Sequence, residues 1–282
     1  MNAVTEQRKV LLEIADLKVH FDIKDGKQWF WQPSKTLKAV DGVTLRLYEG
    51  ETLGVVGESG CGKSTTARLL MQLLTQDSGE LIFDGQGAGS SRLPLKAYRR
   101  QVQMVFQDSY ASLNPRLTME ESIAFGQRVH GVSAREASEY ARYLLAHVGL
   151  EPARFADRYP HALSGGQRQR VNIARALAMD PEIVFFDEPS AGLDPVSAAL
   201  LDELILELKE NMGMTVVVVT HDLDSIFTIG NNSVFLDAVT HTMITGGDPH
   251  VLRCDQAHPD IVRFLNRGKT DSCPTSSKGY RS

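Results

Sequence analysis

The sequence lacks the marks of a disulfide-rich, membrane-spanning or exported protein. Its three cysteines, Cys61, Cys254 and Cys273, show no C-x-x-C spacing, which predicts reduced thiols and neither a disulfide framework nor a zinc site. No apolar run approaches the roughly 18 residues of a membrane-spanning helix. The start, residues 1–9, is polar, and the apolar stretch 10–12 is too short for a signal-peptide core. We therefore expect that any role at a membrane is exercised from the cytoplasmic face, through a partner.

An excess of basic residues is also missing. The chain has 35 acidic and 30 basic residues, a formal net charge of -5. Proteins that bind nucleic acid need a basic face, so we expect no nucleic-acid partner. The hydrophobic share, 42%, is ordinary for a globular protein and predicts a sizeable core. At 282 residues, the chain has room for one large domain or two small ones.

A glycine-rich loop between an expected strand and an expected helix is the first feature that carries chemistry. Residues 52–56 form an apolar run typical of a strand buried on both faces. Glycines permit backbone conformations closed to other residues, and free N–H groups at a helix start face anions. This predicts a nucleotide-phosphate site in which Lys63 reaches the β and γ phosphates and Ser64 binds Mg²⁺. The loop consists of Gly57, Glu58, Ser59, Gly60, Cys61, Gly62, Lys63, Ser64 and Thr65.

The thiol of Cys61 lies within this loop, next to the start of the expected helix. A helix N-terminus can lower the pKa of a thiol. We therefore expect that alkylation of Cys61 abolishes nucleotide binding and that bound nucleotide protects the thiol.

Polar residues follow two further buried strands, expected at 183–186 and 216–219. Ligands bind at the carboxyl ends of strands in open α/β sheets, so Asp187 suits Mg²⁺ coordination. Asp187 and the acidic residue after it form a pair at the strand end. An isolated pair of this kind is more often a solvated cap, but the presence of the phosphate loop favours a functional role here. Apart from the histidine that follows the second of these strands, the histidines, His241 among them, have no metal-ligand spacing and are expected at the surface.

A second anion site is predicted by the segment Leu163-Ser164-Gly165-Gly166-Gln167-Arg168-Gln169-Arg170. A helix is expected from Gln167 to Met179, where Asp180-Pro181 stops it. Ser164, Gly165 and Gly166 can therefore form an anion cradle at its N-terminus.

These motifs, in this order, resemble the ATP-binding cassette (ABC) ATPases over residues 11 to 266. The resemblance implies an α/β fold: a P-loop NTPase (RecA-like) core with an N-terminal antiparallel β subdomain and an inserted α-helical subdomain. Residues 1–94 and 164–266 would form the core with its β subdomain, and 95–163 the helical signature subdomain. Residues 267–282, rich in Lys, Ser and Gly, are expected to be disordered.

The resemblance also implies roles for single residues. Glu188 would be the general base that polarises the attacking water, and His221 would contact the γ-phosphate of ATP. Gln107 matches the glutamine loop, whose amide reaches Mg²⁺ and the water. Phe21 lies where the family stacks an aromatic ring on adenine, although the aromatic residues at 29–31 are alternatives and simple packing is as good an interpretation.

A second cassette is implied as well. In the family, the cradle of Ser164, Gly165, Gly166 and Gln167 faces the γ-phosphate held by the other subunit. The loop from Ala191 to Asp194 fits the segment that crosses between the two sites, with Asp194 near the nucleotide. One copy would then be catalytically incomplete, and a homodimer or a heterodimer with a paralogous cassette is expected.

Two branches of the family compete for the cargo. Residues 1 to about 180 resemble oligopeptide/dipeptide importer ATPases, whereas residues from about 185 resemble ATPases of mammalian-cell-entry-type lipid transporters. Because membrane partners dock on the helical segment, which is of the peptide type, import of oligopeptides is favoured. The first resemblance rests on residues 56–65, 106–116 and 158–161, and the second on residues 187–195, 220–227, 230–237 and 259–265.

We therefore expect the ATP-hydrolysing subunit of an oligopeptide importer, peripheral on the cytoplasmic face of the inner (plasma) membrane. Its partners would be permease subunits and, indirectly, an extracytoplasmic substrate-binding protein. One alternative is the ATPase of a phospholipid transporter. Another is a soluble ABC ATPase acting on nucleic acid or ribosomes, which the negative charge and the absence of a second cassette disfavour. A non-catalytic assembly module is disfavoured because Lys63, Asp187, Glu188 and His221 are all present.

Overall fold

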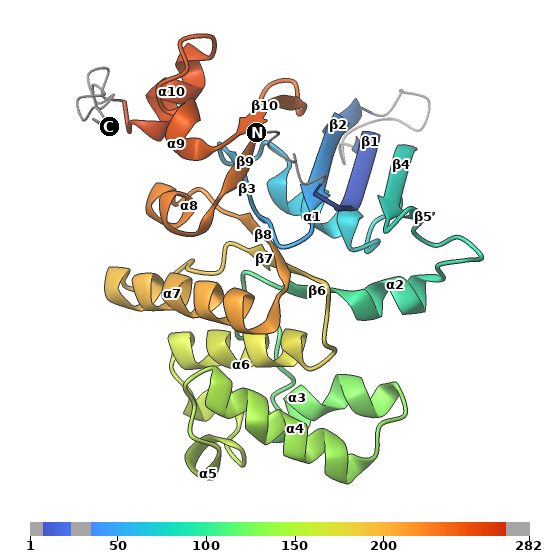
Figure 1. The fold of residues 1–282 in the computed structure, drawn as a ribbon, viewed down its shortest axis with the longest axis vertical. Coiled ribbons are helices and arrows are strands. Elements are labelled where there is room, and N and C mark those ends of the chain that lie inside the picture. The colour runs from blue at the N-terminus through green and yellow to red at the C-terminus, as the bar shows by residue number, and fades with distance from the viewer. Residues whose placement is uncertain (1–7, 24–34, 269–282) are drawn as a thin grey trace, which may run out of the picture.

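A six-stranded sheet forms the centre of the molecule in this computed structural model, which describes residues 8–23 and 35–268 (Figure 1). Its strand order is β10-β9-β3-β8-β7-β6, and neighbours pair in parallel except β10, which is antiparallel to β9. The strands are β3 (Thr52–Gly57), β6 (Val102–Val105), β7 (Ile183–Asp187), β8 (Thr215–Val219), β9 (Asn232–Leu236) and β10 (Met243–Gly247).

The apolar runs of the central strands serve two cores at once, because successive side chains of a strand point to opposite faces. In β7, Phe186 packs into a cluster with the large helical layer, whereas Phe185 packs into a cluster shared with the second sheet. In β8, Val218 and Val219 divide in the same way. A sheet covered on both faces needs such continuous hydrophobicity, which the sequence shows.

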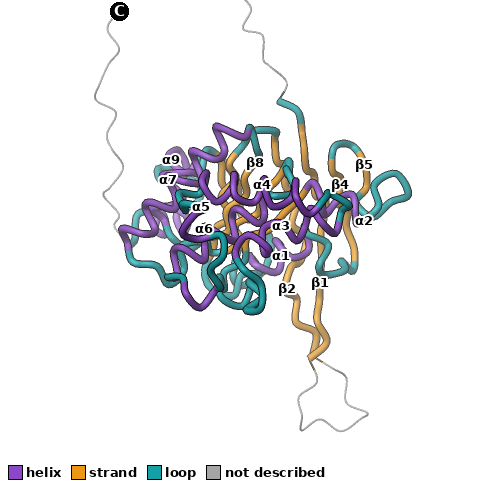
Figure 2. Tube along the Cα trace, turned by 90° about the horizontal axis from the view of Figure 1, so that it is seen from below, coloured by secondary structure: helices purple, strands orange, loops and turns teal. Residues whose placement is uncertain are grey.

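The second sheet is antiparallel, with the order β2-β1-β4-β5. Strand β1 pairs with both β2 and β4 and is therefore an interior strand of this sheet. The partial period-two alternation of its residues fits an edge strand or an interior strand, and only the pairing partners distinguish the two. Strands β1 and β2 run side by side (Figure 2). The strands are β1 (Val10–Ile23), β2 (Lys35–Tyr48), β4 (Ser78–Phe83) and β5 (Gln86–Gly87).

Helices cover the central sheet, and a group of them forms the lower end of the molecule in Figure 1. There α6 and α7 lie next to the sheet, with α3, α4 and α5 beyond them. The helices are α1 (Lys63–Leu70), α2 (Leu95–Gln101), α3 (Met119–Val129), α4 (Ala134–His147), α5 (Pro152–Phe155), α6 (Gly165–Leu177), α7 (Pro195–Met212), α8 (Leu223–Ile229), α9 (Pro249–Leu252) and α10 (Pro259–Leu265), with a 3-10 turn, η1 (Pro160–Ala162).

One strand interrupts the stretch 95–163, for which mostly helix was expected. Val102–Val105 is β6, which pairs in parallel with β7 and so belongs to the central sheet. The Val-Gln-Met-Val run is too short to be assigned by periodicity alone, and its tertiary pairing decides its conformation. The helices beyond β6 begin at α3, where Thr118 and Glu121 form a capping box.

The cysteines differ in state. Cys61 is a free, buried thiol. Cys254 is disulfide-bonded, so the expectation of three reduced thiols is wrong at this position. Within the described residues, no helix is both long and apolar enough to cross a membrane.

Tyr98 of α2 links the two sheet systems and yields a test of the core. It is fully buried, its ring packs edge-on against Phe83 at 5.6 Å, and its hydroxyl donates to the carbonyl of Leu70 at the end of α1. Tyr98→Phe leaves that buried carbonyl without a donor, so the free energy of unfolding should fall by about 1–3 kcal/mol in urea denaturation. The control Tyr143→Phe changes a half-exposed tyrosine and should alter stability by less than about 0.5 kcal/mol. Equal stability of the two variants would contradict a stabilising role for the Tyr98 hydroxyl.

Candidate functional site

A cavity of about 700 Å³ opens where β3, β7 and β8 end. Carboxyl ends of parallel strands are the usual ligand-binding edge of an α/β sheet. Twelve side chains or glycines expected at the site line this cavity: Phe21, Gly57, Glu58, Ser59, Gly60, Gly62, Lys63, Ser64, Thr65, Gln107, Glu188 and His221.

The glycine loop owes its shape to Gly62, the residue before α1. Gly62 has φ +97°, a conformation that residues with side chains rarely adopt. A Cβ atom there would lie 2.3 Å from the carbonyl oxygen of Ala39 in β2. Gly60 also has positive φ, +85°, but an added Cβ would meet no atom within 4 Å. Gly62 therefore presses the loop against the antiparallel sheet, and Gly60 leaves its open side free for a ligand.

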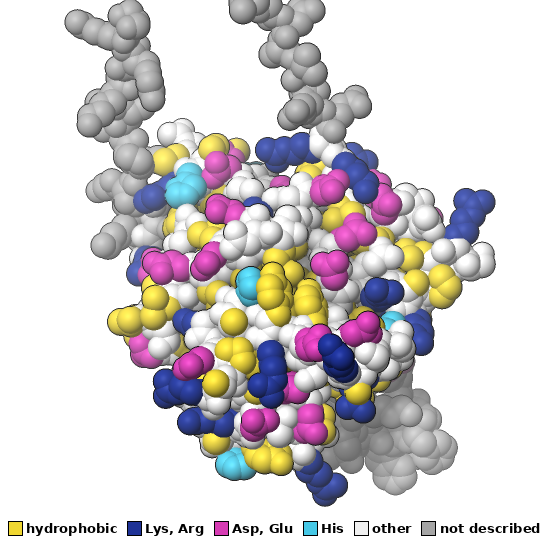
Figure 3. All heavy atoms as spheres, turned by 60° about the horizontal axis from the view of Figure 1, so that its bottom comes forward, with side chains coloured by type: hydrophobic (Ala, Val, Ile, Leu, Met, Phe, Trp, Pro, Cys, Tyr) yellow, Lys and Arg dark blue, Asp and Glu magenta, His cyan; other side chains and the backbone are white. Residues whose placement is uncertain are grey.

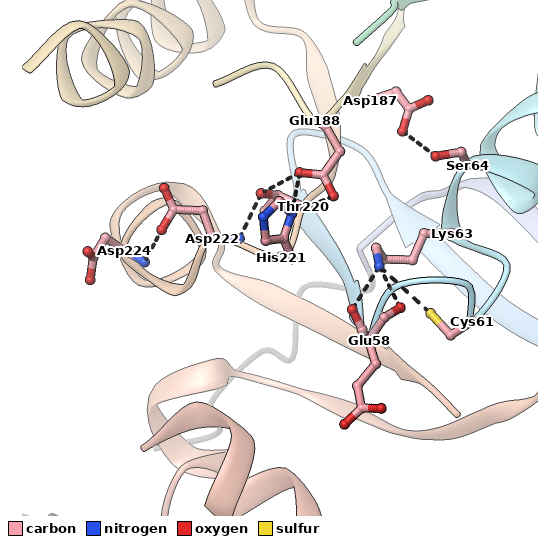
Figure 4. Close-up of polar contacts among 11 residues, drawn as sticks. Glu58, Cys61, Lys63, Ser64, Asp187, Glu188, Thr220, His221, Asp222 and Asp224 are labelled. Carbon is pink, nitrogen blue, oxygen red and sulfur yellow. Dashed lines mark hydrogen bonds and ion pairs between the residues drawn. The ribbon is translucent and has the colours of Figure 1, made fainter. Parts of the chain in front are cut away.

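The ammonium group of Lys63 lies inside this loop. It donates to the carbonyl oxygens of Gly57 at 2.7 Å and Glu58 at 2.9 Å, and the residue is only 7% exposed (Figure 4). These bonds satisfy a charge that would be costly to bury unpaired. They also hold the positive charge at the centre of the loop, where an anion would be bound.

Cys61 does not have the environment expected for a reactive thiol. It is 1% exposed, and burial raises the pKa of its thiol although Lys63 lies nearby and acts in the opposite direction. The expectation of a helix-lowered pKa is therefore wrong, because desolvation outweighs the field of the helix end. Cys61 does not line the cavity and faces the interior of the loop.

Ser64 and Asp187 meet across the gap between α1 and β7. The Ser64 hydroxyl donates to Asp187 Oδ1 at 2.8 Å (Figure 4). Asp187 is 2% exposed, and burial raises the pKa of its carboxyl, partly offset by the Ser64 hydrogen bond. A cation in this position would lower that pKa again, because an adjacent positive charge favours the ionised form. Hydroxyl and carboxylate oxygens are the ligands that Mg²⁺ prefers, so this pair fits a Mg²⁺ site.

Glu188 and His221 form the second polar pair, at the ends of β7 and β8. His221 Nδ1 lies 2.9 and 2.8 Å from the two Glu188 carboxylate oxygens (Figure 4). Glu188 is 8% exposed, whereas the His221 side chain is 70% exposed. A proton on Nδ1 is donated to the carboxylate, so Nε2 is the nitrogen available to a ligand.

The backbone of Glu188 is itself unusual. Its φ is +48°, and its N–H donates to the carbonyl oxygen of Val219 at 2.8 Å. Left-handed geometry in a residue with a side chain costs of order 1 kcal/mol or more and marks positions that the surrounding structure over-determines. Thr220 adds a long hydrogen bond of 3.4 Å to Glu188 Oε2. The carboxylate is thus held in place from both its backbone and its side chain.

The segment after Gln107 is fixed to helix α6. Asp108 accepts from the N–H groups of Tyr110 and Ala111, which closes a turn. Asn172 of α6, fully buried, donates to the carbonyl of Ser109 at 3.1 Å, and Arg175 of α6 donates to that of Ser112. Gln107 therefore stands between the cavity and a segment that α6 holds.

The residues of the predicted anion cradle lie away from this cavity. Ser164 is the N-cap of α6 and forms a capping box with Gln167, so the start of this helix is well ordered. None of Ser164, Gly165, Gly166 and Gln167 lines the cavity, and neither does Asp194, the N-cap of α7. A single chain therefore does not bring these residues to the site of Lys63.

Four cavity residues were missed from the sequence. Leu37 and Ala39 come from β2, His241 from the turn between β9 and β10, and Phe264 from α10. His241 was expected to be an ordinary surface residue, but it also lines this cavity. No motif signals these positions, since each reaches the site only through the tertiary fold.

The aromatic residues at 29–31 lie outside the described residues. Of the aromatic rings considered for the base, Phe21, 39% exposed, is therefore the one that lines the cavity within the described part of the chain.

Curated relatives extend over most of the chain. The oligopeptide transport ATP-binding protein OppF of Escherichia coli is 54% identical over 226 residues, covering 79% of this chain and 67% of that protein. The oligopeptide transport ATP-binding protein AppF of Bacillus subtilis is 41% identical over 262 residues, 92% of this chain and 78% of that protein.

Solved structures agree with the fold. The cassette MJ0796, in a dimeric post-hydrolysis state bound to ADP and Pi, superposes with a TM-score of 0.72 at 30% identity, covering 84% of this chain and 98% of that one. CbiO1 from Clostridium perfringens gives a TM-score of 0.72 at 25% identity, covering 92% and 95%. These similarities confirm the predicted α/β cassette fold. A family model described as ABC transporter matches residues 40–191, and with these relatives it shows that the chain belongs to the ATP-binding subunits of the ABC transporter family.

Proposed function

We propose that this chain binds and hydrolyses ATP to drive the import of oligopeptides through partner permeases. The observation that carries the proposal is one cavity that unites the phosphate loop around Lys63 with Glu188 and His221. The family supplies the reaction class, and relatives such as OppF of Escherichia coli supply the cargo by name.

The phosphate end of ATP fits the glycine loop. Lys63 offers a buried ammonium group, and α1 begins directly at this residue, so its first N–H groups face the same anion. Gly60 leaves the side of the loop free. Ser64 and Asp187 would hold Mg²⁺, with the Gln107 amide as a further oxygen ligand from the cavity wall. When bound, Mg²⁺ supplies positive charge to the phosphate oxygens.

The base of ATP would lie at the other end of the cavity. Phe21 and Leu37 bring apolar surface from the antiparallel sheet to the same cavity as the loop. Stacking of an aromatic ring on a base contributes about 1–3 kcal/mol and tolerates any base. Phe21 is the residue that we assign to this contact.

Hydrolysis would depend on Glu188 as the general base. Its carboxylate is held at one position, and it would accept the proton of a water that attacks the γ-phosphorus in line with the departing ADP. His221 orients the carboxylate through Nδ1 and presents Nε2 to the γ-phosphate. Gln107 would orient the water with an amide that changes no charge in the site.

A second cassette would complete the site. Ser164, Gly165, Gly166 and Gln167 form an exposed or half-exposed helix start away from the cavity of their own chain. In a facing pair, this start would meet the γ-phosphate in the partner's site, and the loop ending at Asp194 would cross between the two. The dimeric state of the related MJ0796 cassette supports this arrangement.

Permease subunits would dock at the helical end of the molecule. Apolar, acidic and basic side chains mingle on this face (Figure 3), and Phe125 and Val129 of α3 are 59% and 57% exposed. Such a surface suits a specific protein contact better than a purely charged one. We place the chain at the cytoplasmic face of the inner (plasma) membrane, where a substrate-binding protein on the other side would supply the permeases.

Peptide cargo is favoured over lipid by both the first and the last third of the chain. The resemblance of residues from about 185 to lipid-transport ATPases finds no support in the relatives described above. AppF of Bacillus subtilis aligns over 92% of the chain, so similarity to peptide-transport proteins extends into its last third.

Gly62→Ala tests the phosphate loop. The new Cβ would strain a left-handed residue and approach the Ala39 carbonyl to 2.3 Å, so the loop must shift. ATP affinity, measured by calorimetric titration, should fall at least about tenfold, a loss of 1.4 kcal/mol. In the control Gly87→Ala, the new Cβ meets nothing closer than 4.0 Å, and affinity should not change. Unaltered affinity in Gly62→Ala would refute this placement of the phosphate.

Glu188→Gln tests the general base. The amide keeps the shape of the side chain but cannot take up a proton, so steady-state hydrolysis should fall at least about a hundredfold while ATP still binds. The closed pair of cassettes should accumulate with ATP, as seen by size-exclusion chromatography. Glu182→Gln, exposed just before the same strand, should hydrolyse ATP at the parental rate. A parental rate in Glu188→Gln would show that the base is another residue.

Affinity purification from gently solubilised membranes tests cargo and partners. The tagged chain should retain peptide-type permeases, identified by mass spectrometry. Phe125→Asp should lose them, because it places a charge in the proposed docking surface, whereas Val251→Asp, on α9 and at least as exposed, should keep them. Retention of lipid-type permeases would overturn the peptide assignment while leaving the ATPase intact.

A further inference from the structure

A buried carboxyl outside the cavity joins the two helices that follow the catalytic strand ends. Asp202 of α7 is 5% exposed, and Ser225 of α8 is 1% exposed. The Ser225 hydroxyl donates to Asp202 Oδ2 at 2.7 Å. Helix α7 follows the loop that starts at Glu188, and α8 begins two residues after His221. Neither Asp202 nor Ser225 lines the nucleotide cavity.

The stability of the fold does not explain this pair. Asp202 Oδ1 is buried and has no hydrogen-bond partner among the described residues. Burial raises the pKa of the carboxyl; the Ser225 hydrogen bond offsets this in part, and the nearby Asp222 adds to it, so that the net direction is upward. An apolar side chain of similar size would avoid the desolvation penalty and is often at least as stabilising in such a position. The Asp202 carboxyl instead provides a directional contact, because its hydrogen bond holds the Ser225 hydroxyl at a defined distance and angle.

The position of Ser225 decides what is fixed. Ser225 lies in the first turn of α8, whose N-cap is Asp222, with Asp222 Oδ1 accepting from the N–H of Asp224 at 3.0 Å. A hydrogen bond that keeps this turn on α7 therefore also fixes the short connection between β8 and α8, which contains His221. The Glu188–His221 contact of 2.8 Å joins the same two segments at the cavity. Two polar contacts thus tie them, one at the site and one behind it.

We propose that the Asp202–Ser225 hydrogen bond positions His221: it anchors the first turn of α8 on α7 and so keeps the imidazole against Glu188. Asp202 and Ser225 are positioning residues, because they touch neither nucleotide nor water at the site. The expected effect on the rate of ATP hydrolysis rests on the proposed function. The placement of the His221 ring does not, and it can be measured whether or not the chain hydrolyses ATP.

The first measurement is a double-mutant cycle on ATP hydrolysis. Asp202→Ala and Ser225→Ala should each lower kcat about tenfold, whereas KM for ATP should change less than twofold, since binding lies in the phosphate loop. The double variant should be no slower than the slower single variant, because both changes remove one interaction. Asp202→Asn, whose amide oxygen still accepts from Ser225, should restore most of kcat. Additive losses in the double variant, or no rescue by Asp202→Asn, would overturn the proposal.

The second measurement follows the imidazole of His221 by NMR in the nucleotide-free chain, with His221→Gln to assign the signal. The signal should move in Asp202→Ala and Ser225→Ala. It should stay in place in Ser122→Ala, which removes a buried serine hydroxyl that, unlike that of Ser225, has no hydrogen-bond partner within the described part of the chain. All variants are compared below their unfolding temperatures. An unmoved His221 signal in both variants would refute the positioning role. If the parental chain hydrolysed no ATP, the proposed function would fail, and the NMR result would still decide the placement of His221.

Discussion

The close approach of Gly62 to the carbonyl of Ala39 is the contact on which the nucleotide site depends. With no side chain between them, the phosphate loop lies directly on β2 of the antiparallel sheet. The loop and the apolar wall formed by Phe21 and Leu37 are therefore parts of one rigid arrangement, although they come from different sheets. The distance between the phosphate end and the base end of the cavity follows from this contact. A loop held by flexible side chains would leave that distance open.

Opposing electrostatic effects decide the state of the groups around the loop. A helix end contributes about 0.3–1 kcal/mol to a nearby charge, whereas transfer of a charged group out of water costs several kcal/mol unless it is paired. Burial therefore prevails at Cys61 and at Asp187, and it raises the pKa of both. Lys63 escapes this cost because two backbone carbonyls receive its hydrogen bonds. The site thus combines one paired cation with the buried carboxyl of Asp187, whose pKa a bound cation would lower again.

The parts of the site that were predictable are those whose chemistry is local in sequence. The phosphate loop, the acids after β7 and the histidine after β8 are recognisable because strand, turn and polar residue follow each other directly. Leu37, His241 and Phe264 were not predictable, since a strand register, a hairpin turn and a late helix bring them to the cavity. The same limit explains β1 and β6. Their residues allow a strand, but pairing with β4 and β7 determines whether the strand is interior and to which sheet it belongs.

The attachment of the glutamine-loop segment to α6 has a consequence for communication. Asn172 and Arg175 hold the carbonyls of Ser109 and Ser112, and Ser164 opens the same helix. One helix thus carries, at its start, the group that would face a neighbour's ATP and, along its side, the segment that leads to the chain's own ATP. In a facing pair, α6 of each cassette would therefore couple two nucleotide sites. Departure of a phosphate from one site would change the other site through this helix, without any change in the central sheet.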